Sequence, residues 1–225
     1  MHGTVILLAL LAAGLSGPAR AFEECGELYN AYGPFDYRTS ANMLAIVEKV
    51  HFTPDIEALR RGNTAPLGAE IDYTLRASPN HHRALIAMTN LVRTTKTERP
   101  TGAQYTVSCY FDRAIRFAPD DGVVRLIYGT HLSRSGKRPE AIKQLELAQS
   151  LDENNPNVHY NLGLLHFERK DYSKARLHAQ RAYALGFELP GLRKMLEGAG
   201  QWESPAAPRQ TPPGVTRDTP ATAPK

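Results

Sequence analysis

The strongest constraint on the fold is an internal repeat with a spacing of 34 residues. Residues 122–155 and 156–189 align without a gap, and small or apolar residues occupy matching positions in both. The matching pairs are Gly129 with Gly163, Ala141 with Ala175, Leu145 with Ala179, Ala148 with Ala182 and Leu151 with Leu185. A repeat of this length indicates stacked helical units, each of which buries its apolar face against its neighbours.

Each unit carries the sequence signals of two helices. In the second unit Asn155 can cap a helix whose first turn contains Pro156, and Asp171 can cap the helix that follows. Small residues recur in that following helix at i, i+4 and i+7, as Ala175, Ala179 and Ala182. Small side chains at these positions favour a close approach of the neighbouring helix.

The segment YNLGLLHFERKDYSKARLHAQRAYAL, from Tyr160 to Leu185, resembles the tetratricopeptide repeat. The resemblance implies an all-α fold, a right-handed superhelical stack of helix-turn-helix units with a less regular N-terminal region. Upstream, the segment from Tyr110 to Pro119 resembles the second helix of an earlier repeat, and residues 79–92 resemble its first helix. The two are separated by about six residues too many, which predicts an insertion or a lengthened helix at 94–104.

This frame divides the chain into segments of different character. They are a signal peptide at 1–21, an N-terminal region of uncertain fold at 22–78 with a possible degenerate repeat at 54–78, a first repeat with an insertion at 79–121, further repeats at 122–155 and 156–189, a capping helix at 190–201 and a disordered, Pro-rich tail at 202–225. Within 54–78 we expect a short helix from Asp55 to Arg61 and another from Ala69 to Ala77. A capping helix is expected because the last apolar face of a stack would otherwise meet water.

The N-terminus predicts export. An apolar run from Val5 to Leu15 leads to Ala19-Arg20-Ala21, a small-x-small pattern at which signal peptidase cuts, here before Phe22. The run is too short for a comfortable membrane span, so we expect only indirect association with a membrane. The predicted location is therefore the periplasm or the outside of the cell. The formal net charge of +4 is mild and its cations are scattered among acids, which argues against a nucleic-acid partner.

The two cysteines, Cys25 and Cys109, lie 84 positions apart. In an exported protein an even number of cysteines permits a disulfide, which across such a loop would add on the order of 4 kcal/mol of stability. The alternative is two unpaired thiols, because Cys109 falls on a helix face that is predicted to be partly buried. The export signal favours the disulfide.

The histidines do not form a recognisable metal motif. His159 and His166 lie seven residues apart on one predicted helix, which separates them by about 10 Å along its axis, so the sequence favours packing over a shared ion. His81 and His82 are adjacent and therefore point in different directions. There is no HExxH or paired-cysteine motif, no GxSxG and no Gly-rich phosphate loop. The sequence accordingly predicts no metal, no cofactor and no enzyme.

The tetratricopeptide resemblance implies a groove lined by the first helix of each repeat, in which a peptide of a partner protein binds. The residues that it assigns to this groove are Arg83, Ile86, Asn90, Arg93, Leu126, Ile127, Thr130, Arg134, Asn157, Tyr160, Asn161, Leu164 and Glu168. Asn90 and Asn161 match in type two residues with which some family members bind a terminal carboxylate. The second repeat lacks a basic partner beside Val123 and Leu126, which favours a more apolar ligand.

The sequence therefore predicts a scaffold or adaptor that binds a partner protein, and the predicted export is compatible with an envelope assembly. It identifies neither that partner nor the oligomeric state. Three alternatives stay open. The N-terminal region could fold into the groove and fill it. Residues 22–78 could form a ligand-binding or enzymatic module that the repeats support. The repeats could also self-associate, with the Pro-rich tail as a spacer.

Overall fold

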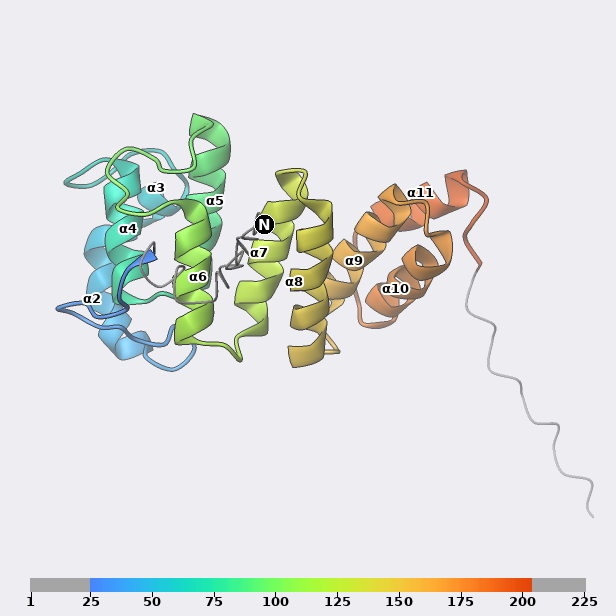
Figure 1. Ribbon diagram of the computed structural model, residues 1–225, viewed down its shortest axis with the longest axis horizontal. Coiled ribbons are helices and arrows are strands. Elements are labelled where there is room, and N and C mark those ends of the chain that lie inside the picture. Colours follow the sequence, from blue (N-terminus) through green and yellow to red (C-terminus); the bar gives the residue numbers. More distant parts are fainter. Residues whose placement is uncertain (1–24, 204–225) are drawn as a thin grey trace, which may run out of the picture.

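The computed structural model describes residues 25–203, so the predicted signal peptide at 1–21 and residues 204–225 of the tail lie outside it. Within the described residues the chain is helical and contains no strand, which confirms the all-α prediction. The helices follow one another in a single elongated stack (Figure 1). They are α2 (Ala41–His51), α3 (Pro54–Glu57), α4 (Leu67–Ala77), α5 (His82–Thr95), α6 (Val107–Phe117), α7 (Gly122–Arg134), α8 (Arg138–Leu151), α9 (Pro156–Glu168), α10 (Tyr172–Ala184) and α11 (Gly191–Gly198).

The regular repeats are the helix pairs α7–α8 and α9–α10, preceded by the pair α5–α6. Their starts carry the expected caps: the side chain of Asn155 accepts a hydrogen bond from Asn157 N at 3.1 Å, and that of Asp171 accepts one from Lys174 N at 3.3 Å. Between α5 and α6, residues 96–106 form a connecting loop rather than a lengthened helix. The predicted mismatch in the first repeat is thus an insertion.

Two glycines set the close packing within and after these repeats. A Cβ atom on Gly129 would lie 2.7 Å from Leu145 Cγ, and one on Gly163 would lie 2.5 Å from Leu192 Cδ2. Both contacts are too short for a carbon pair, so a larger residue at either position would require the facing leucine side chain to shift. The alanines at 175, 179 and 182 are fully buried on α10, as the stripe of small residues predicts.

The N-terminal region continues the stack, because α4 packs on both α2 and α5. The helix expected from Asp55 to Arg61 is too long: α3 ends at Glu57, and Leu59 adopts a left-handed backbone with φ of 56°. Helix α2 lies upstream of the expected degenerate repeat at 54–78 and was not predicted. Only Leu44 and Val47 of α2 are buried, so its apolar pattern is weak.

Residues 25–40, called the strap here, contain no helix beyond their first residue and lie across α4 and α6 (Figure 1). Cys25 forms a disulfide with Cys109 of α6, with sulfur atoms 2.06 Å apart. The buried Arg113 of α6 donates hydrogen bonds to the carbonyls of Cys25 at 3.1 Å and Glu27 at 2.6 Å. Arg116 of α6 also donates to the carbonyl of Gly26 at 2.9 Å, so one covalent and three charge-assisted contacts fix the start of the strap.

The far end of the strap is fixed to the turns that precede α5 and α7. The buried Asn80 side chain donates to Asp36 Oδ1 and to Asp121 Oδ2, both at 2.9 Å. Arg38 forms an ion pair with Asp36 at 2.7 Å, and its hydrogen bonds hold the pKa of the Asp36 carboxyl well below its usual range. Burial alone would raise the pKa of Asp121, but its hydrogen bonds from His82 and Asn80 lower it.

At the other end of the stack α11 closes the last apolar face. Leu192 and Leu196 of α11 are fully buried, and Trp202 lies against Tyr183 with ring centroids 6.0 Å apart. The helix occupies residues 191–198, within the expected 190–201. Among the described helices, none has the length and apolar character needed to cross a membrane.

Candidate functional site

Helices α5, α7 and α9 share a hollowed face, called the groove here. Its main cavity of about 230 Å³ is lined by Ile86, Thr89, Leu126, Ile127, Thr130, His131, Arg134, Asn157 and Asn161. A smaller cavity of about 100 Å³ adjoins it and is lined by Thr89, Asn90, Val92, Arg93, His131, Arg134 and Ser135. Most of the residues that the repeat resemblance assigns to a groove therefore meet at this face.

The strap does not occupy the groove. Its hydrogen bonds, ion pairs and disulfide go to α4, to α6, to Met43 of α2 and to the turns before α5 and α7. None of these partners lines either groove cavity. The strap therefore fills neither groove cavity, although one assigned groove residue, Arg83, pairs with Glu57 of the N-terminal region.

The floor of the groove is apolar. Ile86 is 46% exposed and Leu126 is half-buried, although both belong to well-packed helices. Ile127 lies beneath them and is 8% exposed. An exposed branched side chain in the lining of a cavity offers apolar surface that another side chain can cover.

The polar groups of the groove fall into two kinds. The hydroxyls of Thr89 and Thr130 each donate to a carbonyl of their own helix at 2.8 Å. Asn161 Nδ2 also donates within its helix, to Asn157 O at 2.8 Å, which leaves its Oδ1 atom available as an acceptor. The side chains of Asn90 and Asn157 take part in no hydrogen bond between described residues, so they can both donate to and accept from a ligand backbone.

The carboxyl ends of α5 and α7 add positive charge to the groove. Arg93 and Arg134 are exposed, border the smaller cavity and form no ion pair in the described part of the chain. His131 lines both cavities. Burial lowers the pKa of His131, and Lys137 and Arg134 lower it further, while Glu98 opposes them. His131 is therefore neutral at pH 7.

Four of the predicted groove residues lie outside both cavities. Arg83 forms an ion pair with Glu57, and Glu168 forms one with Arg138 at 2.6 Å. Tyr160 stacks on Phe187 with ring centroids 4.1 Å apart, and Leu164 packs in the same C-terminal cluster as Leu192 and Leu196. The chain after α10 folds back over the far end of α9, so Tyr160 and Leu164 contact the cap instead of an open face.

The sequence analysis missed four residues that line the two cavities: Thr89, Val92, His131 and Ser135. None of them belongs to a motif. Thr89 lies three residues after Ile86, and His131 lies four residues after Ile127, so each shares a helix face with an assigned groove residue. Helical periodicity alone could have included these two.

A third histidine joins His159 and His166, which the sequence analysis did not predict. His178 of α10 lies with its Nδ1 atom 3.1 Å from His159 Nδ1, and its ring stacks on that of His166 with centroids 5.5 Å apart. Burial, with the neighbouring His159 and His166, lowers the pKa of His178 from its ordinary 6.5 to about 4. Among the described residues no cluster of three or more His, Cys, Asp or Glu side chains is arranged to hold a metal ion. These rings pack the seam between α9 and α10.

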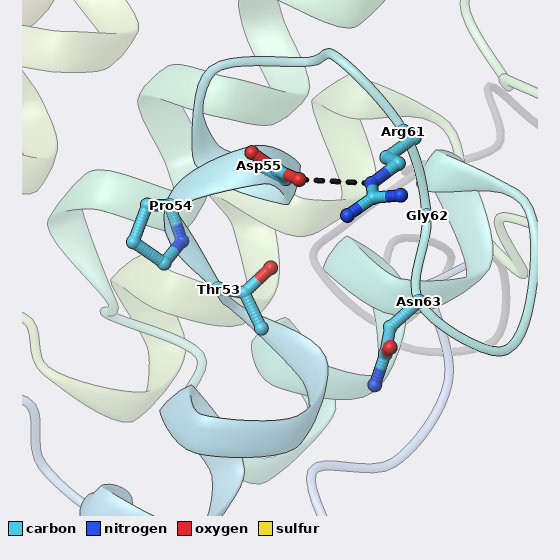
Figure 2. Close-up of a pocket in the computed structure, with 6 residues that line it drawn as sticks. All are labelled: Thr53, Pro54, Asp55, Arg61, Gly62 and Asn63. Carbon is cyan, nitrogen blue, oxygen red and sulfur yellow. Dashed lines mark hydrogen bonds and ion pairs between the residues drawn. The ribbon is translucent and has the colours of Figure 1, made fainter.

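A larger cavity of about 400 Å³ lies beside α3, between Thr53, Pro54, Asp55 and the loop residues Arg61, Gly62 and Asn63 (Figure 2). Asp55 is already paired with Arg60 at 2.6 Å and with Arg61 at 2.9 Å. The lining contains no large apolar or aromatic side chain, and the charges of Asp55 and Arg61 neutralise each other. Small-molecule sites are usually lined mainly by apolar and aromatic side chains, so this cavity is a weaker candidate than the groove.

The family model described as a TPR repeat matches residues 133–170, which include α8 and α9. The chain thus contains a tetratricopeptide repeat, as the sequence resemblance indicated. A human protein, Protein O-mannosyl-transferase TMTC3, is 29% identical to this chain over 103 residues. The match covers 46% of this chain and 11% of that protein, so it supports a likeness between segments and not between whole proteins.

Proposed function

We propose that this chain is an exported scaffold that binds a segment of a partner protein in the groove of α5, α7 and α9. The observation that carries the proposal is the open cavity of about 230 Å³ on these three first helices, with the exposed Ile86 in its lining. Tetratricopeptide repeats generally mediate contacts between proteins, and stacked repeats present such surfaces along one side.

Export is the second part of the proposal. It is supported by the apolar N-terminal run with its small-x-small site and by the pairing of Cys25 with Cys109. A disulfide between residues that are distant in the sequence is typical of proteins that fold in an oxidising compartment. The periplasm or the cell exterior meets this requirement.

An enzymatic or ligand-binding module in residues 22–78 has less support. Helices α2, α3 and α4 pack as members of the stack, and α3 and α4 share the core cluster of α5 and α6. The carboxylate of Glu70 is a buried acid that such a module would use. Its Oε1 atom accepts hydrogen bonds from the backbone of the loop at 63–65, and its Oε2 atom lies 2.6 Å from His51 Nδ1, so both oxygens already have partners.

The test uses the full mature chain with one substitution in the groove and one outside it. I86D places a charge on the apolar floor, whereas L177D places the same charge on α10, where Leu177 is 64% exposed and lines neither groove cavity. We expect I86D to lose a partner that co-purifies with the parent chain and L177D to keep it, with the unfolding temperatures nearly unchanged. Retention of that partner by I86D contradicts the proposal.

A further inference from the structure

The two ends of the groove differ in chemistry. The main cavity has an apolar floor at Ile86 and Leu126, with the amides of Asn157 and Asn161 on one side. The smaller cavity, at the carboxyl ends of α5 and α7, is bordered by Arg93 and Arg134. A ligand that fits this surface must combine an apolar side chain with an anionic group that accepts hydrogen bonds from two guanidinium ions.

The positive charge at that end is only partly compensated. Cations near a helix carboxyl terminus interact favourably with the helix dipole, which explains why Arg93 and Arg134 are tolerated there. Nevertheless neither has a carboxylate partner among the described residues, whereas Arg138 nearby is paired with Glu168. The negative charge of Glu98 raises the pKa of the neighbouring His131, and the positive charge of Lys137 lowers it.

The size of the groove cavities also restricts the ligand. Their volumes of about 230 and 100 Å³ lie below the roughly 300–1,000 Å³ of sites that enclose a small molecule. A cavity of that size accommodates side chains of a longer ligand that continues beyond it. The free amides of Asn90 and Asn157 suit the backbone of such a ligand.

We infer that the groove binds an internal, extended segment of a partner protein in which a branched apolar residue is flanked by Asp or Glu. This inference rests on the proposed function. The apolar residue contacts Ile86 and Leu126, and a carboxylate on one side pairs with Arg93 and Arg134. Arginine forms bidentate hydrogen bonds with carboxylates. The two arginines therefore recognise the shape of a carboxylate group in addition to its negative charge.

The chain's own tail does not have this chemistry. Residues 204–225 contain three cations, Arg209, Arg217 and Lys225, against one acidic side chain, Asp218. Like charges in the groove and the tail disfavour their association. A partner segment of opposite charge is the better match.

The inference is tested by selecting random linear peptides on the mature chain, with the peptides displayed inside a carrier loop so that they have no free terminus. We expect the selected peptides to contain Leu, Ile or Val next to Asp or Glu. Their affinity should fall by about tenfold or more for R93Q/R134Q and should decrease as ionic strength rises. A matched control, R169Q/R181Q, removes the same charge from exposed residues that line neither cavity and should leave the affinity unchanged.

The outcomes separate this inference from the proposed function. Peptides that bind in an I86D-sensitive manner, yet lack acid enrichment and tolerate R93Q/R134Q, overturn the acidic segment and leave the groove as a docking site. Selected peptides that match the Pro-rich tail overturn it in favour of an intramolecular ligand. Failure to select any I86D-sensitive peptide contradicts both proposals.

Discussion

The N-terminal half of the stack, residues 25–121, and the C-terminal half, residues 122–203, hold their helices together in different ways. The first half uses a disulfide, a strap and buried polar groups such as Glu70, Asp72 and Arg113. The second half uses small residues that let helices approach closely, with Gly163 as the tightest contact. Where the 34-residue spacing is lost, specific polar and covalent contacts replace the generic fit of one repeat on the next.

Removal of the disulfide, which only the first half contains, is expected to have the largest effect on stability. C25S/C109S should destabilise the chain by about 2–5 kcal/mol, because the unfolded state regains the freedom of a long loop. Hydrogen exchange should become faster in α4 and α6 and stay nearly unchanged in α9 and α10. Uniformly faster exchange across all helices would show that the two halves unfold as one unit.

The next effect concerns Arg113, which is 1% exposed and binds two strap carbonyls. R113M retains much of the side-chain volume but leaves those carbonyls without their donor, at a cost of about 2–3 kcal/mol. Chemical denaturation measures the loss. R181M, on the exposed side of α10, is the control and should change the stability by less than about 0.5 kcal/mol.

A smaller effect is expected for the glycine contact in the second half. G163A places a methyl group against Leu192, which costs about 1–3 kcal/mol of overpacking and is partly offset by the higher helix propensity of alanine. G198A, with nothing within 4 Å of the added carbon, gains the propensity alone. Thermal unfolding should therefore shift downward for G163A and upward for G198A. A stabilised G163A would mean that α11 can move away freely.

Low pH is expected to destabilise the second half, because the seam between α9 and α10 contains three neighbouring histidines. The folded-state pKa of His178 is about 4 and its unfolded value is near 6.5, so the unfolded state binds the proton first as the pH falls. Stability should therefore decrease from about pH 6.5 to pH 4, by on the order of 1 kcal/mol per pH unit from this residue. Carboxylates such as Asp171, whose pKa is lowered, contribute their loss only at lower pH.

H178F keeps an aromatic ring between His159 and His166 but removes the titrating group. The urea midpoint of H178F should depend less on pH than that of the parent chain between pH 6.5 and pH 4.5. An unchanged slope would assign the acid sensitivity to other buried histidines, such as His81, whose pKa burial also lowers.

Much of the second half could be predicted from its sequence. Asn155 and Asp171 indicate two helix starts by local hydrogen bonds, and the spacing of Gly129 and Gly163 indicates a close contact in both regular repeats. These signals are short-range or periodic, so one sequence reveals them. The groove positions on α5 and α7 followed from the resemblance to the tetratricopeptide repeat.

The rest depends on contacts between distant residues that carry no periodic signal. The strap binds Arg113 and Asn80 through isolated long-range contacts of two hydrogen bonds each, and nothing near Arg113 in the sequence identifies its partners. The repeat resemblance assigned Tyr160 to the groove. Its contact with Phe187, in the segment after α10, could not be foreseen from the repeat. His178 was missed for the same reason, since its partners lie on another helix.

The most direct test of the central claim places a photo-crosslinking amino acid at Thr130 in the groove, and separately at Leu177 on α10, in cells that produce the chain. The proposed function predicts that the Thr130 variant crosslinks to one defined segment of a partner protein, identified by mass spectrometry, and that I86D abolishes the product. The Leu177 variant should not yield it. The same partner segment crosslinked from Leu177 and not from Thr130 would contradict the groove as the docking surface.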